Sequence, residues 1–204
     1  MCGYILYICK LLIKRYDHIL IQLNEDVVIG DPSKEVGIES VQFNNVKPGN
    51  FYVFHKKYFC GKEGDKIGQI MVIHEEHLND ELPWIKKGLR IKVDSGCAGV
   101  FTEDTYRKDD LFLKKSEYIK GLPSGITKEG ENWYGHMIDR LTPDKHGTYF
   151  KGCVCNTPDT NKAYEVHVAR FRRRPVGIMI DFNLDHTRYA KYDWWMVNKP
   201  VTAL

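Results

Sequence analysis

Apolar and polar residues alternate with period two along most of this chain, a pattern typical of short β-strands buried on one face. It predicts strands over residues 18–23 and 26–29, with a tight turn at Asn24-Glu25 between them. Residues 51–74 form a predicted hairpin, because an aromatic and β-branched run and a second apolar run flank the turn at 61–65. The first part of the chain is therefore expected to be β-rich.

Between residues 103 and 143 the apolar residues recur at three- and four-residue intervals instead, which predicts two short helices separated by residues 121–125. About 40 residues supply too little apolar surface for a separate core, so we expect this helical insertion to cover one face or edge of a sheet. The rest of the chain returns to strands, predicted over residues 148–156, 163–171, 176–182 and 192–197. Short loops between consecutive strands favour antiparallel pairing in a meander. The predicted fold is mainly β, an antiparallel sandwich or partly open barrel with a short α-helical insertion.

The composition is that of a globular chain: 204 residues, 43% of them hydrophobic, are enough for one substantial core. We expect an N-terminal apolar extension over residues 1–16 and a single β-rich domain over residues 17–204. Lys14-Arg15 follow the apolar run of this extension, whereas a secretory signal carries its positive charge before the apolar run. About 11 residues are also too few to span a bilayer as a helix. It is expected to pack on the core or to form a poorly ordered tail, with attachment to a membrane surface as the minor alternative.

Charge and cysteine content set further expectations about partners and location. A formal net charge of +3 is too mild to indicate a nucleic-acid partner, and none is predicted. The six cysteines are scattered and form no disulfide framework, which favours reduced, buried thiols and a cytoplasmic location. Cys153 and Cys155 are expected to share one face of a strand.

The segment from His74 to His77 contains two histidines and two glutamates, a combination that a motif search would flag as a metal site. A zinc-protease helix places its two histidines four residues apart on one face, whereas these are three apart and follow a predicted strand. The segment is therefore expected to be a solvated loop or helical turn, and no metal ligand is assigned to it.

The stretch from Lys92 to Phe101 is the strongest candidate for a site, because a β-type run delivers Asp94 and Ser95 onto a glycine-containing turn before apolar residues resume. Asp31, between Gly30 and Pro32, is a second acidic residue at the end of a predicted strand. We expect these two aspartates, remote along the chain, to meet at one rim of the fold. The polar loop at 156–162 is expected to lie beside them.

The order of these motifs resembles an uncharacterised, mostly bacterial family with a Gly-Asp-Pro stretch, a Val-Asp-Ser-Gly-x-Ala-Gly stretch and a late glycine-rich turn. The likeness covers about residues 26 to 183 and implies an architecture rather than an activity. Ser33-Lys34 and Cys97 stand where that family has Cys-Tyr and Gln. The resemblance, together with the 156–162 loop, gives the following candidate ligand-binding residues: Asp31, Asp94, Ser95, Gly96, Gly99, Asp159 and Tyr164.

Three functions remain open from the residues alone. The first is a binding or interaction module for a protein or small-molecule ligand, in which an acidic partner would depend on the arginine run at 172–174. No cofactor is predicted for it.

The other two are enzymatic, and their catalytic residues are unknown. A metal-assisted hydrolase would use Asp31 and Asp94, with Asp159 or a histidine, to hold a divalent cation that activates water. A nucleophilic hydrolase would use Cys97 or Ser95. Its activating base would be one of three histidines, His55, His74 or His167.

Overall fold

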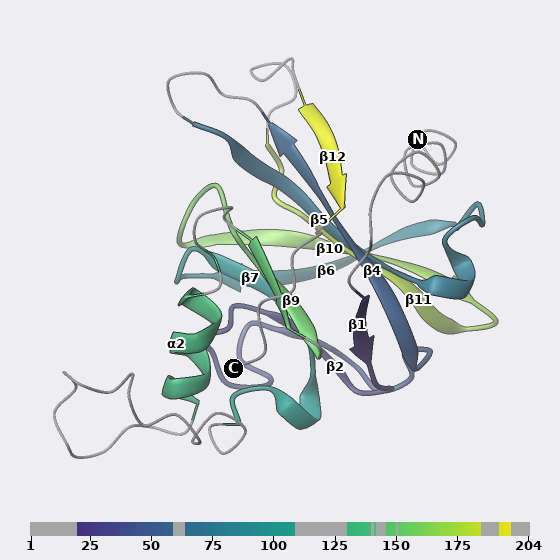
Figure 1. Ribbon diagram of the computed structural model, residues 1–204, viewed down its shortest axis with the longest axis horizontal. Coiled ribbons are helices and arrows are strands. Elements are labelled where there is room, and N and C mark those ends of the chain that lie inside the picture. Colours follow the sequence, from purple (N-terminus) through teal and green to yellow (C-terminus); the bar gives the residue numbers. More distant parts are fainter. Residues whose placement is uncertain are drawn as a thin grey trace, which may run out of the picture.

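The computed structural model describes residues 20–58, 64–108, 130–139, 141, 146–149, 151–184 and 192–196, and they form two antiparallel sheets (Figure 1). The larger, sheet A, is seven-stranded with the order β1-β4-β5-β11-β10-β6, and β12 also pairs with β4. Its strands are β1 Leu20–Leu23, β4 Gly49–Tyr58, β5 Lys66–His74, β6 Trp84–Val93, β10 Lys162–Phe171, β11 Arg174–Asp181 and β12 Tyr192–Met196. The smaller, sheet B, is five-stranded with the order β3-β2-β7-β9-β8. Its strands are β2 Val27–Gly30, β3 Val41–Phe43, β7 Cys97–Thr102, β8 His146–Tyr149 and β9 Gly152–Asn156.

The main core lies between the two sheets. Phe51 and Ile178 of sheet A and Ile29 and Val100 of sheet B belong to one buried apolar cluster. Two sheets packed face to face through alternating inward residues form a sandwich, as the sequence predicted, and the sheets do not close into a barrel.

The outer faces of both sheets carry apolar clusters of their own. Helix α2 (Glu131–Asp139) covers sheet B, where Trp133 and Met137 pack against Phe101 (Figure 1). On sheet A the cluster includes Met71 and Leu78, the latter just after the 3₁₀ helix η2 (Glu75–His77). A second 3₁₀ helix, η3 (Glu103–Thr105), follows β7. No helix among the described residues is long and apolar enough to cross a membrane.

Several predicted elements are confirmed. Strands β4 and β5 form the expected hairpin, with pairs from Phe51 opposite His74 to Tyr58 opposite Lys66. Helix α2 is the second of the two predicted helices, whereas the first falls largely outside the described residues. The predicted N-terminal extension over residues 1–16 also lies outside them.

The predicted C-terminal meander is wrong except for the pairing of β10 with β11. Residues 148–156 contain the end of β8 and all of β9, which form a hairpin in sheet B. The chain then crosses to sheet A through the loop at 157–161, and β12 pairs with β4 rather than with β11. A five-residue polar loop is long enough to change sheets, so loop length alone did not determine the pairing.

Two histidines face each other between the sheets. His55 follows Phe51 and Val53 on the inward face of β4 and is 3% exposed. Its ring centroid lies 4.2 Å from that of His146 in β8. Burial, together with the charges that His146 and Lys57 would present, holds the pKa of His55 well below its ordinary value of 6.5. The core therefore contains a neutral imidazole at neutral pH.

This buried imidazole predicts a pH-dependent stability. In the unfolded chain His55 takes up a proton as the pH falls through 6.5, whereas in the folded chain it does not until a much lower pH. The unfolded state thus binds more protons, so the free energy of unfolding is expected to decrease below about pH 6.5. Urea unfolding of the wild type and of His55→Leu, at about pH 7.5 and pH 5.5, measures this. The variant is expected to show the shallower pH dependence, and equal dependence in both proteins would contradict the prediction.

Candidate functional site

Asp31, directly after β2, is 1% exposed and accepts five hydrogen bonds. The backbone N–H and the hydroxyl of Ser33 each donate to Oδ1 at 2.8 Å, and the Ser95 hydroxyl donates to the same oxygen at 2.6 Å. The backbone N–H groups of Asp94 and Ser95 both donate to Oδ2 at 2.8 Å. The carboxylate thereby joins the loop after β2 to the turn between β6 and β7.

Tyr106, directly after η3, strengthens the same connection. Its hydroxyl lies 2.9 Å from the carbonyl oxygen of Asp31 and 2.8 Å from that of Lys34, so it donates toward both. Burial raises the pKa of Tyr106, which keeps the hydroxyl protonated and able to donate. The base of the β2–β3 loop is therefore fixed from two sides.

Beside this base lies a network of four charged side chains, two from the β2–β3 loop and two from the end of β6 and the turn after it. Lys34 pairs with Asp94 at 2.5 Å and approaches Glu39 at 3.7 Å, while Lys92 reaches Glu39 at 3.2 Å and Asp94 at 3.5 Å. The hydrogen bond from Lys34 lowers the pKa of Asp94, and the same bond raises the pKa of Lys34. We call Lys34, Glu39, Lys92 and Asp94 the charged rim.

The loop at 157–161 completes this end of the sandwich. The Thr157 N–H donates to the Gly96 carbonyl at 2.8 Å, and the Thr160 methyl lies 3.3 Å from where a Gly96 side chain would begin. Asp159 pairs with Lys162 at 2.7 Å. The structure thus brings Asp31, Asp94, Ser95, Gly96 and Asp159 to one end of the fold, as the sequence analysis expected.

The two remaining candidate residues lie inside the fold. Tyr164 is 1% exposed in the main core, and its hydroxyl donates to the Asp159 carbonyl at 2.7 Å, which holds the loop in place. Gly99 is within β7, opposite Gly30 of β2. Neither presents a side chain to solvent.

The three aspartates do not converge on a shared cation position. Asp31 already accepts five donors, more than the about four lone-pair directions that a carboxylate offers. Asp94 and Asp159 are paired with lysines. Their arrangement fits carboxylates that organise loops better than carboxylates that hold a metal ion.

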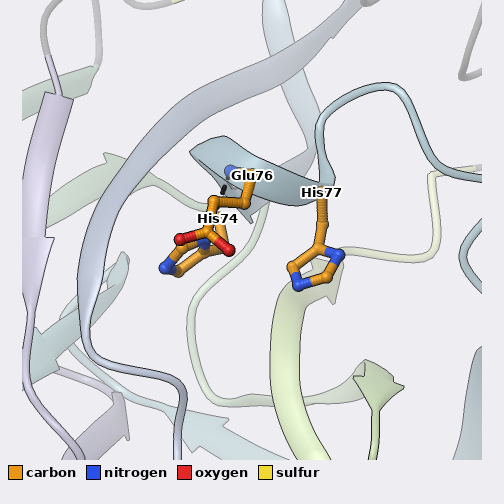
Figure 2. Close-up of side chains that lie close together, drawn as sticks. All are labelled: His74, Glu76 and His77. Carbon is orange, nitrogen blue, oxygen red and sulfur yellow. Dashed lines mark hydrogen bonds between the residues drawn. The ribbon is translucent and has the colours of Figure 1, made fainter.

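Within the described residues, one group of metal-ligating side chains does lie together: His74, Glu76 and His77, with ligand atoms within 4.8 Å of one another (Figure 2). Both ring nitrogens of His74 are already engaged. Its Nδ1 accepts the Glu76 N–H at 3.2 Å, and its Nε2 lies 3.3 Å from the Pro48 carbonyl. His74 therefore caps the 3₁₀ helix η2.

Lys47 supplies the cation of this cluster. Its ammonium lies 3.2 Å from His77 Nε2 and also pairs with Glu76, while His77 Nδ1 bonds to Asp80 at 2.7 Å. A lysine ammonium held between an imidazole nitrogen and a carboxylate takes the place that a divalent cation would need. These contacts agree with the prediction that the segment provides no metal ligand. The structure does not test it, so it stays a prediction.

The nucleophile hypothesis finds little support in the geometry. Burial, reinforced by Asp31, raises the pKa of the Cys97 thiol to about 11, so it stays protonated near neutral pH. Ser95 donates to Asp31 and accepts the Cys97 N–H at 3.2 Å. In the described part of the chain, neither residue has a histidine among its hydrogen-bond partners.

The remaining histidines proposed as bases lie elsewhere. His55 is in the core, and His74 caps η2. His167, in β10, lies 3.9 Å from Glu165. Cys153 and Cys155 both belong to the main core and so share a face as expected, while Cys2, Cys9 and Cys60 lie outside the described residues.

In comparisons with protein-family models, with curated proteins and with solved structures, the chain matches none. The family resemblance drawn from its motifs therefore stays a prediction.

Sequence reasoning missed the residues that give this end of the molecule its surface. Lys34, Glu39 and Lys92 had only one signal, the density of charges around the two aspartates. Tyr106 had none, because its role depends on a carbonyl about 75 positions away in the chain.

Proposed function

We propose that this chain is a protein-binding module that engages its partner through the β2–β3 loop. The observation that carries the proposal is the exposure of two apolar side chains, Val36 at 39% and Ile38 at 48%, on a loop whose base is fixed. They are two of four large hydrophobic residues exposed in the described part of the chain. Exposed apolar side chains on a loop with a fixed base favour a binding surface.

Hydrogen bonds within the loop and to β6 support its conformation. The Gly37 N–H donates to the Ser40 hydroxyl at 3.0 Å, and the Lys92 N–H donates to the Glu39 carbonyl at 3.0 Å. Glu39 itself has a φ of 53°, a left-handed conformation that these contacts maintain. A loop that is ordered by its own contacts loses less entropy on binding than a disordered one.

The surroundings of the loop indicate the chemistry of the partner. The charged rim combines two lysines with two acidic residues, so it presents no single sign of charge to a polyanion. A small apolar contact surrounded by charges of both signs is the usual anatomy of a protein–protein interface. This supports a protein partner over a nucleic acid.

The proposal includes a cytoplasmic location, which the cysteines support. Cys97, Cys153 and Cys155 are buried and free of disulfides. Burial raises the pKa of Cys153 to about 12, so it remains a thiol. Reduced, packed thiols suit a cytoplasmic protein.

The proposal predicts a specific covalent adduct from the loop. The photocrosslinking residue p-benzoylphenylalanine replaces exposed Glu35, and the protein is irradiated in the cells in which it is naturally made. One protein adduct, identified by mass spectrometry, is expected. The double substitution Val36→Ser and Ile38→Ser should lower its yield roughly tenfold, since two apolar anchors are lost.

The same probe at Ile85, which is 37% exposed on β6, is the matched control and should not give this adduct. The two serine substitutions are at exposed positions, so they should change the free energy of unfolding by no more than about 0.5 kcal/mol. An adduct that persists in the double variant, or equal labelling from Ile85, would rule out the loop as the binding surface.

A further inference from the structure

A second surface lies at the tip of the β10–β11 hairpin, at the end of β10 that is away from the loop at 157–161 (Figure 1). Phe171 pairs with Arg174, so Arg172 and Arg173 form a two-residue turn. Four of the five residues from 170 to 174 are arginines. All but Arg170, which is half-buried, are exposed.

This turn uses residues that its backbone disfavours. Arg172 and Arg173 have φ values of 48° and 71°, the left-handed pair of a type I′ turn. Asn-Gly is the preferred sequence for that turn, because the left-handed region brings Cβ close to the following carbonyl oxygen, which glycine avoids and asparagine offsets by local hydrogen bonding. A strained turn that keeps two arginines points to a use for their charges.

Most of these charges have no acidic partner among the described residues. Arg174 pairs with Glu25. Arg170 lies over the Phe43 ring at 5.6 Å and donates to the Arg173 carbonyl at 2.7 Å. In the part of the chain that the structure describes, Arg170, Arg172 and Arg173 have no acidic partner.

An aromatic platform lies beneath them. Phe171 is 43% exposed, and the Arg172 guanidinium lies 5.3 Å from the centroid of its ring. The His77 ring lies 4.7 Å from the Phe171 ring and connects the hairpin to Lys47 (Figure 2 shows His77 projecting from η2). The tip thus combines several donors with an exposed apolar face.

We propose that this hairpin tip, defined as residues 170–174, binds an acidic segment of a partner protein through paired arginine–carboxylate contacts. Guanidinium groups bind carboxylates through two parallel hydrogen bonds. The Phe171 ring offers an apolar contact to the methylene groups of the partner's acidic side chains. Glu25 pairs with Arg174 at the edge of the tip, so the unpaired positive charges cover only a short stretch, which suits a short acidic segment. The small net charge of +3 also favours a short acidic peptide over a nucleic acid.

The test measures fluorescence anisotropy of a short, labelled poly-glutamate peptide with the full chain. The wild type is expected to bind it, with an affinity that falls as salt is added. The double substitution Arg172→Asn and Arg173→Gly should weaken binding by at least about tenfold, because it removes two charge-assisted contacts. Since Asn-Gly suits the turn, the melting temperature of this variant should equal or exceed that of the wild type, so lost binding would not reflect lost folding.

The matched control, Arg90→Gln with Lys162→Gln, removes two exposed positive charges from elsewhere on sheet A and should retain most of the affinity. Equal loss in both double variants would mean that only net charge matters and would overturn the proposal. Absence of peptide binding by the wild type would overturn it as well. A single-stranded oligonucleotide of equal charge should bind more weakly, and tighter binding that depends on Arg172 and Arg173 would assign the tip to nucleic acid instead. None of these outcomes depends on Val36 or Ile38.

Discussion

Replacement of Asp31 by alanine is expected to lower the free energy of unfolding by about 3 to 5 kcal/mol. The variant loses five hydrogen bonds at once, and three of them come from the backbone N–H groups of Ser33, Asp94 and Ser95. Those donors lie around a side chain that is 1% exposed, so water replaces the carboxylate only if the loop and the turn separate. Urea unfolding followed by circular dichroism measures the loss.

Asp94→Asn is the matched control, since it changes the neighbouring carboxylate in the same network. The Asp94 side chain is 27% exposed and pairs with lysines at the surface, so we expect a loss of no more than about 1 kcal/mol. Equal stability of Asp31→Ala and Asp94→Asn would show that the five hydrogen bonds do not hold this end of the sandwich together.

The two aspartates occupy similar positions in the fold but have different roles. Both occupy the strand-end places that the sequence indicated, and the fold brings them together. The Asp31 carboxylate accepts hydrogen bonds from backbone N–H groups of the loop and the turn, whereas Asp94 belongs to the charged rim. A chemistry that needs both as metal ligands would require Asp31 to give up donors that now stabilise the loop.

The sequence predicted the class of fold because period-two alternation is a local property of strands. It predicted the pairing of β4 with β5 and of β10 with β11, but not how the other strands pair. Strands β1 and β2 are separated by only three residues yet belong to different sheets, since residues 24–26 carry the chain across the sandwich. Pairing depends on which apolar faces meet, and this is decided across the whole chain.

The same limit applies to the site. The turn containing Asp94 and Ser95 was identifiable from its glycine and its flanking strands. The binding loop was not, because the exposure of Val36 and Ile38 follows from where Asp31 and Tyr106 hold its base. In the sequence, these two apolar residues are indistinguishable from core residues.

Replacement of Gly99 by alanine is expected to lower the free energy of unfolding by about 3 kcal/mol or more. An added Cβ would lie 2.2 Å from the Cys153 carbonyl oxygen and 2.3 Å from the Phe101 ring. Neither neighbour can move freely, because Cys153 belongs to β9 and Phe101 is buried against Trp133 of α2. The glycine of the Val-Asp-Ser-Gly-x-Ala-Gly motif at this position is thus explained by close packing, with no ligand needed.

Gly135→Ala is the control, and it is expected to change the free energy of unfolding in the opposite direction. Gly135 is exposed in α2, and nothing lies within 4 Å of where its Cβ would be. Alanine there should raise stability by about 0.5 to 1 kcal/mol, because it favours the helix. Thermal and urea unfolding of both variants compare the two effects. A Gly99→Ala protein as stable as the wild type would mean that β7 and β9 can separate to admit a methyl group, and close packing would no longer account for this glycine.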